Sequence, residues 1–314
     1  MTRPPRILVF ASINLDFTLR IDRLPRPGET LLTETAFSCP GGKGANQTVA
    51  AKRLGAHVGI VCCVGDDLPG RAVRRAVEFE GIEIIGWHVE PKLPTAIASI
   101  SVLPDGKNAI VVASGANRAM TPDHVKVALE SDSNWDAALI TLETPLTAVE
   151  AAVRETHARN IPLLIDAGGN PKALRGDLAV IQPNVTLTAN ESELAAITGA
   201  AVTDPAAAER AAAASGFTQL LCKLGDNGSS LKWNAAVTHE PAFPIHAIDT
   251  VAAGDAHSAA FVVAWAERIG DAQPEPAAVR DVLRFANAAG ALACTQSGAF
   301  PAMPFRRDVD LLTR

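Results

Sequence analysis

Asp249-Thr-Val-Ala-Ala-Gly-Asp255, followed by the apolar run Ala256-His-Ser-Ala-Ala-Phe-Val-Val-Ala-Trp265, is the stretch around which the chain is organised. It predicts a tight turn of small residues that leads into a buried helix. Ala252, Ala253 and Gly254 have little or no side chain, so a ligand could approach their backbone N–H groups closely. The first turn of a helix has four N–H groups without intrahelical partners and a positive dipole end. The turn therefore predicts an anion site, and phosphate is the anion that fits it best.

Asp255 is unexpected beside such a site, because a carboxylate repels an anion. A general base that receives a proton from an attacking hydroxyl would explain its position. The alternative is an ordinary helix start in which Asp255 only caps the helix. The stretch by itself leaves both interpretations open.

The composition is typical of a cytoplasmic globular protein. The 314 residues are 48% hydrophobic and 20% charged, which is enough apolar material for a sizeable core. A net charge of −6 predicts no basic surface for nucleic acid or for an anionic membrane. The apolar run at 7–11 is too short for a signal segment or a membrane span. No Cys-x-x-Cys pair occurs, so reduced thiols are expected at Cys39, Cys62, Cys63, Cys222 and Cys294.

Strand-like and helix-like patterns alternate through most of the chain. Helix starts are expected at the glycine-rich stretch 40–48 and, with Thr121 as N-cap, at Pro122. Strands are expected at 6–11, 58–64, 136–142, 161–166, 185–188 and 218–224, with two further β-like stretches before Asp249. The other expected helices are 70–80, 122–131, 146–159, 191–198, 204–215 and about 277–294. This alternation predicts a Rossmann-like α/β fold, in which helices sandwich a mostly parallel sheet.

A second, smaller sheet is expected to leave the main body. Residues 16–22 alternate between polar and apolar side chains, and 31–38 form a second half-exposed strand after the turn at 25–30. Residues 95–103 and 108–114 flank Pro-Asp-Gly-Lys, which predicts a hairpin that joins this sheet. We therefore expect one domain over 1–314, with a lid formed by about 16–38 and 95–114.

Polar residues follow several expected strands at the sheet edge where ligands collect in open α/β folds. They are Asn14, Asp16, Glu143, Asp166, Asn190 and Glu193. The stretch Pro40-Gly-Gly-Lys-Gly-Ala-Asn-Gln-Thr48 adds Lys43 and Asn46 as donors, although its Lys lies between glycines and no Walker pattern results. Together with the anion turn, these groups suit phosphoryl transfer to a polyhydroxylated small molecule.

These motifs resemble the ribokinase/PfkB family of carbohydrate kinases over nearly the whole chain. Gly41-Gly-Lys-Gly-Ala-Asn46, with Gly55 and Gly65, is similar to the N-terminal signature of the family, and 249–255 is similar to the C-terminal one. Ser-Ile-Asn-x-Asp16, Pro-x-Pro-Gly-Glu-Thr30, Leu-Glu143-x-Pro-Leu and Asn190-x-x-Glu193 also match in order. The resemblance implies a ribokinase-like fold and ATP-dependent phosphorylation of D-ribose at O5.

The resemblance also implies roles for individual residues. Asp255 would be the catalytic base, and the N–H groups of Ala253, Gly254 and Asp255 would form the anion hole, with Ala252 in the same catalytic turn. The sugar-binding set would be Asn14, Asp16, Gly42, Lys43, Asn46, Ala98, Ile100, Ile110, Glu143 and Asp255. The nucleotide-binding set would be Asn190, Lys223, Gly225, Asp226, Gly228, Gly254 and Asn287. Glu193 would hold Mg²⁺ through water, and a K⁺ loop would comprise Asp249, Val251, Ala293, Gln296 and Gly298.

By the same resemblance, ATP is the co-substrate, Mg²⁺ and K⁺ are cofactors, and two copies of the chain form a homodimer lid against lid. The sequence departs from the family pattern at several positions, among them Ala189, Lys223, His257, Ser258, Gln296 and Ala302. Ala302 replaces a cation-binding Ser, and Lys223 replaces a Thr. These changes put nucleotide preference and cation dependence in question.

Several alternatives remain open at this stage. A sister kinase acting on another sugar or on a nucleoside is the nearest, and a non-catalytic sugar-binding regulator on the same fold is another. Lys223 is equally well explained as a solvated strand end, Asp166 is better explained as a turn residue than as a ligand, and His257 as a satisfied histidine of the core or its rim.

Overall fold

The computed structural model describes residues 3–104, 108–132, 134–174, 182–269 and 274–314. Its main sheet has nine strands in the order β13-β12-β11-β10-β9-β8-β1-β4-β5. Their bounds are β1 Arg6–Ala11, β4 His57–Gly65, β5 Glu83–Glu90, β8 Ala137–Thr141, β9 Leu163–Asp166, β10 Val185–Asn190, β11 Gln219–Lys223, β12 Ser229–Trp233 and β13 Ala236–Glu240. The strands are parallel except β12 and β13, which continue the sheet as an antiparallel edge. The predicted fold class is confirmed.

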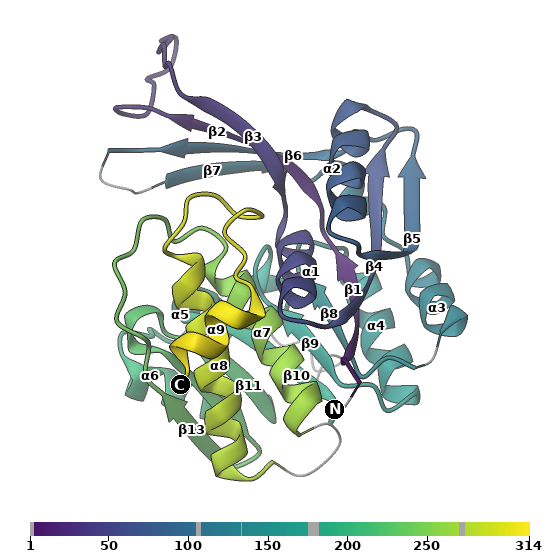
Figure 1. Cartoon of the computed structure of the whole chain (residues 1–314), viewed down its shortest axis with the longest axis vertical. Helices are drawn as coiled ribbons and strands as arrows, with labels where there is room; N and C mark the ends of the chain where they lie inside the picture. Colours follow the sequence, from purple (N-terminus) through teal and green to yellow (C-terminus); the bar gives the residue numbers. More distant parts are fainter. Residues whose placement is uncertain (1–2, 105–107, 133, 175–181, 270–273) are drawn as a thin grey trace.

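Helices cover both faces of this sheet (Figure 1). They are α1 Lys43–Arg53, α2 Leu68–Phe79, α3 Pro122–Ser131, α4 Leu146–Ala158, α5 Glu191–Thr198, α6 Pro205–Ala214, α7 Ala253–Arg268, α8 Pro276–Ala293 and α9 Arg306–Leu312. Side chains of β1 alternate between two cores: Ile7 and Val9 pack with α1, α7 and α8, whereas Leu8 and Phe10 pack with α3 and α4. Because both faces of the strand are buried, its sequence is a continuous apolar run.

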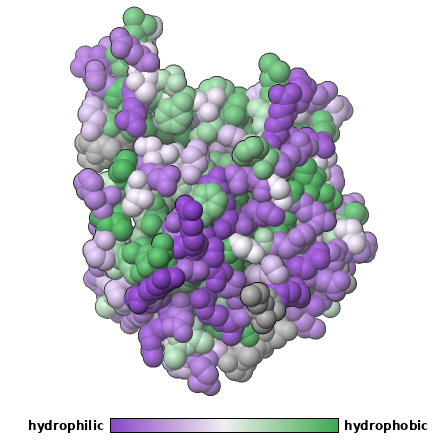
Figure 2. All heavy atoms as spheres, viewed as in Figure 1, coloured by the Kyte–Doolittle hydropathy of each residue, from purple (hydrophilic) through white to green (hydrophobic). Residues whose placement is uncertain are grey.

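The second sheet has four strands in the order β3-β2-β6-β7 and extends beyond the main body (Figure 1). These strands are β2 Asn14–Arg20, β3 Ala36–Gly41, β6 Ala96–Val102 and β7 Asn108–Ala113. The antiparallel β6–β7 pair joins β2 as expected, and β2 and β6 run parallel. Residues 105–107 of the hairpin turn lie outside the described residues. In the space-filling view the end of this sheet projects from the body and mixes hydrophobic with hydrophilic residues (Figure 2).

One expected element has the wrong start, and two elements were missed. The strand expected at 31–38 begins only at Ala36, because Leu32 is 95% exposed and has no strand partner. Strand β5 was not predicted, since its half-buried side chains show no clean alternation along the edge of the sheet. Helix α9 was not predicted either, because it is one short segment with only Val309 buried. No helix in the described part of the chain is long and apolar enough to cross a membrane.

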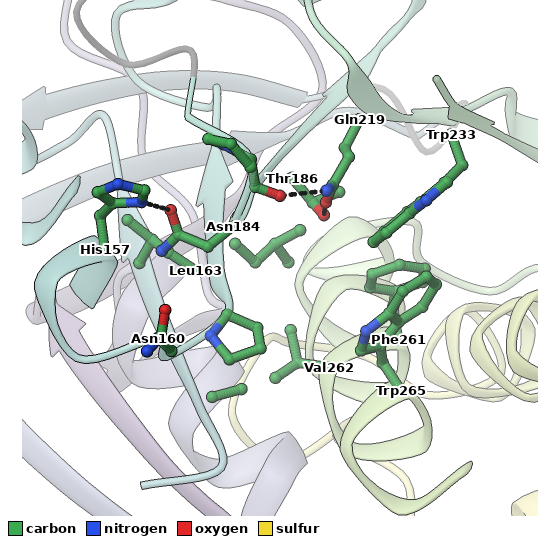
Figure 3. Close-up of a pocket in the computed structure, with 14 residues that line it drawn as sticks. His157, Asn160, Leu163, Asn184, Thr186, Gln219, Trp233, Phe261, Val262 and Trp265 are labelled. Atoms are coloured by element: carbon green, nitrogen blue, oxygen red, sulfur yellow. Dashed lines mark hydrogen bonds between the residues drawn. The ribbon is translucent and has the colours of Figure 1, made fainter. Parts of the chain in front are cut away.

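A hollow of about 500 Å³ lies where β9, β10 and β11 begin, at the far end of these strands from their predicted site residues (Figure 3). Its polar side chains bond to one another, as in the 2.7 Å bond from Thr186 Oγ1 to Gln219 Oε1. Trp233 and Trp265 stack at 4.7 Å between ring centroids on its other side. The hollow therefore belongs to the packing around the C-terminal half of α7, remote from the predicted chemistry.

Candidate active site

The residues singled out from the sequence gather at the carboxyl ends of the parallel strands. Glu143 follows β8, and Asp166, Asn190 and Lys223 are the last residues of β9, β10 and β11. Helices α1 and α7 begin at the same edge, so their N–H groups and positive dipole ends point there. The sheet-edge location expected from the βα pattern is where the structure brings these groups together.

One cavity of about 210 Å³ lies between this edge and the small sheet. Its lining includes all of the predicted sugar-binding residues: Asn14, Asp16, Gly42, Lys43, Asn46, Ala98, Ile100, Ile110, Glu143 and Asp255. Asn108, Val112, Thr250 and Ala299 also line it and were not predicted. Polar groups from β2 and α1 therefore face an apolar wall from β6 and β7, a combination that can hold a small hydroxylated molecule.

A second cavity of about 520 Å³ lies on the other side of the start of α7. Its lining includes all of the predicted nucleotide-binding residues: Asn190, Lys223, Gly225, Asp226, Gly228, Gly254 and Asn287. Glu193 and Ala253 line it too. Asp255, Lys43, Thr250 and Ala252 border both cavities, so Asp255 lies where they meet.

Asp255 is buried and held by neutral donors. Its Oδ2 accepts a 2.8 Å hydrogen bond from Asn46 Nδ2, and its Oδ1 lies 3.5 Å from Gln47 Nε2. Burial raises the pKa of Asp255 to about 6. The Asp166 charge also raises it, whereas the Lys43 charge lowers it. A carboxylate with this pKa is a stronger base than an exposed one while remaining largely ionised at neutral pH.

The turn before α7 is where the sequence predicts an anion site, but two of the three expected N–H groups already donate within the chain. Ala252 adopts a left-handed conformation with φ 61° and ψ 9°, which is uncommon for a residue with a side chain. The N–H groups of Ala253 and Asp255 donate to Thr250 O at 3.4 Å and to Ala252 O at 3.0 Å. The Gly254 N–H has no acceptor among the described residues. Among the N–H groups of residues 253–255, that of Gly254 is therefore the strongest candidate for binding an anion.

The lining of the smaller cavity contains unpaired buried oxygens. Asp16 Oδ1 and Asn46 Oδ1 have no hydrogen-bond partner among the described residues. Burial raises the pKa of Asp16 to about 7, with further contributions from Glu143 and Asp255. A buried oxygen without a hydrogen-bond partner costs free energy, and hydroxyl groups of a ligand would donate to these two oxygens.

Three positioning residues were missed in the sequence. Ser12 Oγ donates to Glu143 Oε2 at 2.6 Å and accepts from Gly44 N at 3.1 Å. Asn117 Nδ2 donates to Asn14 Oδ1 at 3.0 Å, and its Oδ1 accepts from Ile13 N at 3.0 Å. Gln47 Nε2 donates to Asp166 Oδ2 at 3.0 Å and lies 3.5 Å from Asp255 Oδ1. Ser12 and Gln47 stand inside the quoted motifs, whereas nothing in the local sequence marks Asn117.

The interpretation of Asp166 as a turn residue is incomplete: its Oδ1 accepts from Gly168 N at 2.9 Å, but its Oδ2 is the centre of a buried network. Its side chain is fully buried, and Lys223 Nζ, Ser258 Oγ and Gln47 Nε2 all donate to its Oδ2 at 2.9 to 3.0 Å. Burial acts to raise the pKa of Asp166, but the Lys223 and Lys43 charges outweigh it and hold the pKa below its usual range. Lys223 is likewise no solvated strand end, because only 12% of its side chain is exposed.

His257 lines the larger cavity. Its Nε2 is 3.1 Å from Asn287 Oδ1, and its Nδ1 has no partner among the described residues. Burial lowers the pKa of His257 to about 3, so the ring is neutral at physiological pH. The expectation of a satisfied histidine thus holds for one ring nitrogen only.

Asn190 and Glu193, the residues proposed to position Mg²⁺, offer oxygen atoms, some of which already accept hydrogen bonds. Asn190 and Glu193 form a capping box at the start of α5, with bonds of 2.8 and 2.9 Å, and Glu193 Oε1 has no partner within the described residues. No group of three or more His, Cys, Asp or Glu side chains suited to a metal occurs in that part of the chain. One free carboxylate oxygen fits Mg²⁺ bound mainly through water and phosphates.

Asp249 closes the loop that would hold a monovalent cation. Its Oδ1 accepts from Val251 N at 3.0 Å and its Oδ2 from Gly298 N at 2.9 Å. Its own N–H donates to Cys294 O at 3.2 Å, at the end of α8 beside Ala293 and Gln296. The structure therefore brings the predicted loop residues together, with carboxylate and carbonyl oxygens of the kind that a large cation needs.

Comparison with known proteins agrees with this geometry. A ribokinase from Haemophilus influenzae is 32% identical over 305 residues, which cover 96% of both chains. A ribokinase from Bacillus subtilis is 34% identical over 308 residues, which cover 98% of both. The structure of Arabidopsis thaliana ribokinase complexed with ribose and ATP superposes with a TM-score of 0.85 at 28% identity, over 100% of this chain and 99% of that one.

The family assignment follows from a match along almost the whole sequence. The model of the pfkB family carbohydrate kinases matches residues 4–306, a span that contains both glycine-rich signatures and both cavities. The resemblance noted in the sequence is thereby confirmed, and the chain belongs to the PfkB family of carbohydrate kinases.

Proposed function

We propose that the chain transfers the γ-phosphoryl group of ATP to O5 of D-ribose. The observation that carries this proposal is the position of Asp255 and the free Gly254 N–H between a small polar cavity and a larger one. The small cavity suits a pentose, and the larger one has room for a nucleotide. Ribokinase relatives at 32–34% identity support this choice of substrate class.

In the proposed mechanism, Asp16, Asn14, Asn46 and Glu143 orient the sugar so that its primary hydroxyl faces the phosphoryl group in line. Asp255 accepts the hydroxyl proton, and the Gly254 N–H and the α7 dipole stabilise the phosphoryl oxygens. Mg²⁺, held at Glu193 through water, would neutralise phosphate charge. Because the transition state of phosphoryl transfer is loose, a weak but well-placed base is sufficient.

The alternatives are a kinase of another sugar or of a nucleoside, and a regulator that binds sugar without turnover. The cavity of about 210 Å³ is narrow for a nucleoside, because Ala98, Ile100 and Ile110 close one side. A regulator has no need of a buried base whose pKa is raised towards neutrality beside a free helix-start amide. Both considerations favour a pentose kinase, and a cytoplasmic location remains a prediction.

The first prediction tests the substrate. ADP release measured over pentoses, hexoses and nucleosides should give the highest kcat/KM for D-ribose. A wrong substrate leaves buried groups such as Asp16 unpaired, and each such loss costs about 1–3 kcal/mol. Adenosine ranking above D-ribose would reject the ribose assignment while leaving the kinase chemistry in place. No turnover of any sugar would favour the regulator.

The second prediction tests the base. Asp255→Asn should lower kcat by roughly 10²–10⁴-fold with sugar binding nearly intact. Because only ionised Asp255 accepts a proton, kcat/KM of the unaltered enzyme should fall as pH drops below about 6. Asp204→Asn, at an exposed helix cap, is the matched control and should change neither quantity. A variant at position 255 that keeps more than a tenth of kcat would exclude the role.

We also propose that K⁺ activates the enzyme through the Asp249 loop. Asp249 supplies the charge, and backbone oxygens near Val251 and Ala293 complete the set. Ala302 is buried and contributes no hydroxyl oxygen. A water molecule replaces the missing hydroxyl at a cost in free energy, so K⁺ still binds, but more weakly.

The third prediction concerns this cation. Initial rates should rise with K⁺ at constant ionic strength, and Ala302→Ser should lower the half-saturating concentration by up to roughly tenfold, because it restores an oxygen ligand. Ala200→Ser, at an exposed position, should leave the curve unchanged. A flat response in the unaltered enzyme would show that the chain has no activating cation site.

A homodimer through the small sheet is the third part of the proposal. Strand register places Phe17, Ser99 and Val111 side by side on the face turned away from the sugar cavity. Phe17 is 42% exposed and Val111 73%. Small sheets are marginal alone, and exposed apolar side chains on one face favour association.

The fourth prediction tests this assembly by light scattering at micromolar concentration. The unaltered protein should have the mass of a dimer, and Val111→Asp should give a monomer, because it introduces a charge into the proposed interface. Phe79→Asp, which alters an equally apolar but remote side chain that is 90% exposed on α2, should stay dimeric. A monomeric unaltered protein would contradict the proposal.

A further inference from the structure

We propose that the Lys223 ammonium binds the terminal phosphates of the nucleotide beside the Gly254 N–H, and that Asp166 and Ser258 hold it in place. The inference rests on the proposed phosphoryl transfer and adds a charged group to it. It also assigns one role to two of the positions at which the sequence departs from the family pattern.

Lys223 reaches the start of α7 from the end of β11. Its Nζ lies 3.0 Å from Asp166 Oδ2 and 3.3 Å from Ser258 Oγ, while Ser258 Oγ donates to the same carboxylate oxygen at 2.9 Å. A methyl group built on Gly254 would lie 3.5 Å from Nζ. The ammonium therefore lies close to Gly254, whose N–H has no acceptor among the described residues.

The hydrogen-bond inventory of Lys223 leaves a donor for a ligand. An ammonium has three N–H donors. Asp166 and Ser258 accept two of them, and no third acceptor occurs among the described residues. Lys223, Gly254 and Asn190 line the same cavity of about 520 Å³, so the remaining donor lies at the wall of the proposed nucleotide site.

A contribution to folding stability does not by itself explain why the Lys223–Asp166 pair is buried. Asp166 already accepts from Gln47 Nε2 at 3.0 Å, and its Oδ1 accepts from Gly168 N at 2.9 Å. Removing an ion pair from water costs about as much free energy as its attraction returns, so a buried pair is weak support for a purely structural role. A lysine fixed at both sides beside an anion turn is instead preorganised for phosphate, as an electrostatic catalyst requires.

The two departures from the family pattern depend on each other. Lys223 and Ser258 are far apart in the sequence, yet both contact Asp166 Oδ2. A Ser hydroxyl at 258 is small enough to leave room for the lysine and still donate to the carboxylate. The structure thus explains these replacements as one arrangement that brings a cation to the phosphate end of the cavity.

The experiment compares nucleotides that differ only in phosphate number. Dissociation constants of ATP, ADP and AMP are measured with Mg²⁺ by calorimetry on the full chain. For Lys223→Met, we expect ATP affinity to fall roughly 10–100-fold, the usual value of a charge-assisted hydrogen bond to phosphate. ADP affinity should fall less, and AMP affinity should stay unchanged. Ser258→Ala should show a smaller loss with the same order among nucleotides.

Two further variants separate this role from folding and from charge in general. Asp166→Asn combined with Lys223→Met leaves no unpaired buried charge and should show the same selective ATP loss. Lys126→Met removes an exposed charge on α3, where Lys126 only faces Glu130 at 3.8 Å, and should bind all three nucleotides normally.

Each outcome decides between the roles. Equal losses for the three nucleotides, or no loss, would make Lys223 a structural partner of Asp166. Recovery of ATP affinity in the double variant would attribute the loss to the unpaired carboxylate and overturn the inference. Selective ATP loss without turnover of ribose would reject the proposed substrate and support the lysine. Unaltered protein that binds none of the nucleotides would overturn both proposals.

Discussion

The burial of Asp255 at the start of α7 is the constraint on which the rest of the site depends. A carboxylate removed from water is costly unless charges and donors surround it. Here Lys43, Asn46 and the N-terminal end of a helix provide them. Asp255 in turn raises the pKa of Lys43, so the lysine keeps its charge although it is enclosed. The two groups stabilise each other's ionised forms at the junction of the two cavities.

This arrangement requires α1 and the first strand to come very close. A side chain on Gly44 would lie 2.5 Å from backbone atoms of Ala11 and Ser12, so only glycine permits the contact. The contact in turn places Ser12 between the α1 backbone and Glu143. Backbone packing of the main sheet therefore helps to orient the Glu143 carboxylate, and charge balance and close packing act on the same few residues.

The small sheet is tied to the same edge through chain continuity. Strand β2 follows β1 after only Ser12 and Ile13, so Asn14 and Asp16 belong to the small sheet while they face the main one. Asp67 links the other side, because it caps α2 and also accepts two hydrogen bonds from Thr95, just before β6. Movement of the small sheet would thus carry Asn14 and Asp16 with it, so in the proposed kinase closure of the sheet would be coupled to substrate orientation.

The sequence by itself determined the α/β architecture and the glycine-rich helix starts, because periodicity and short-range motifs act over a few residues. The family resemblance of these motifs pointed to part of the lining of both cavities, but not to Asn108, Val112, Thr250 or Ala299. The sequence did not determine β5, which depends on pairing with β4, or the start of β3, which depends on pairing with β2. The side-chain partners of Asn117, Asp166 and Lys223 were decided only by the tertiary structure. Their partners lie 35 to 119 residues away, and a buried polar group acquires its function from whichever donors the fold brings to it.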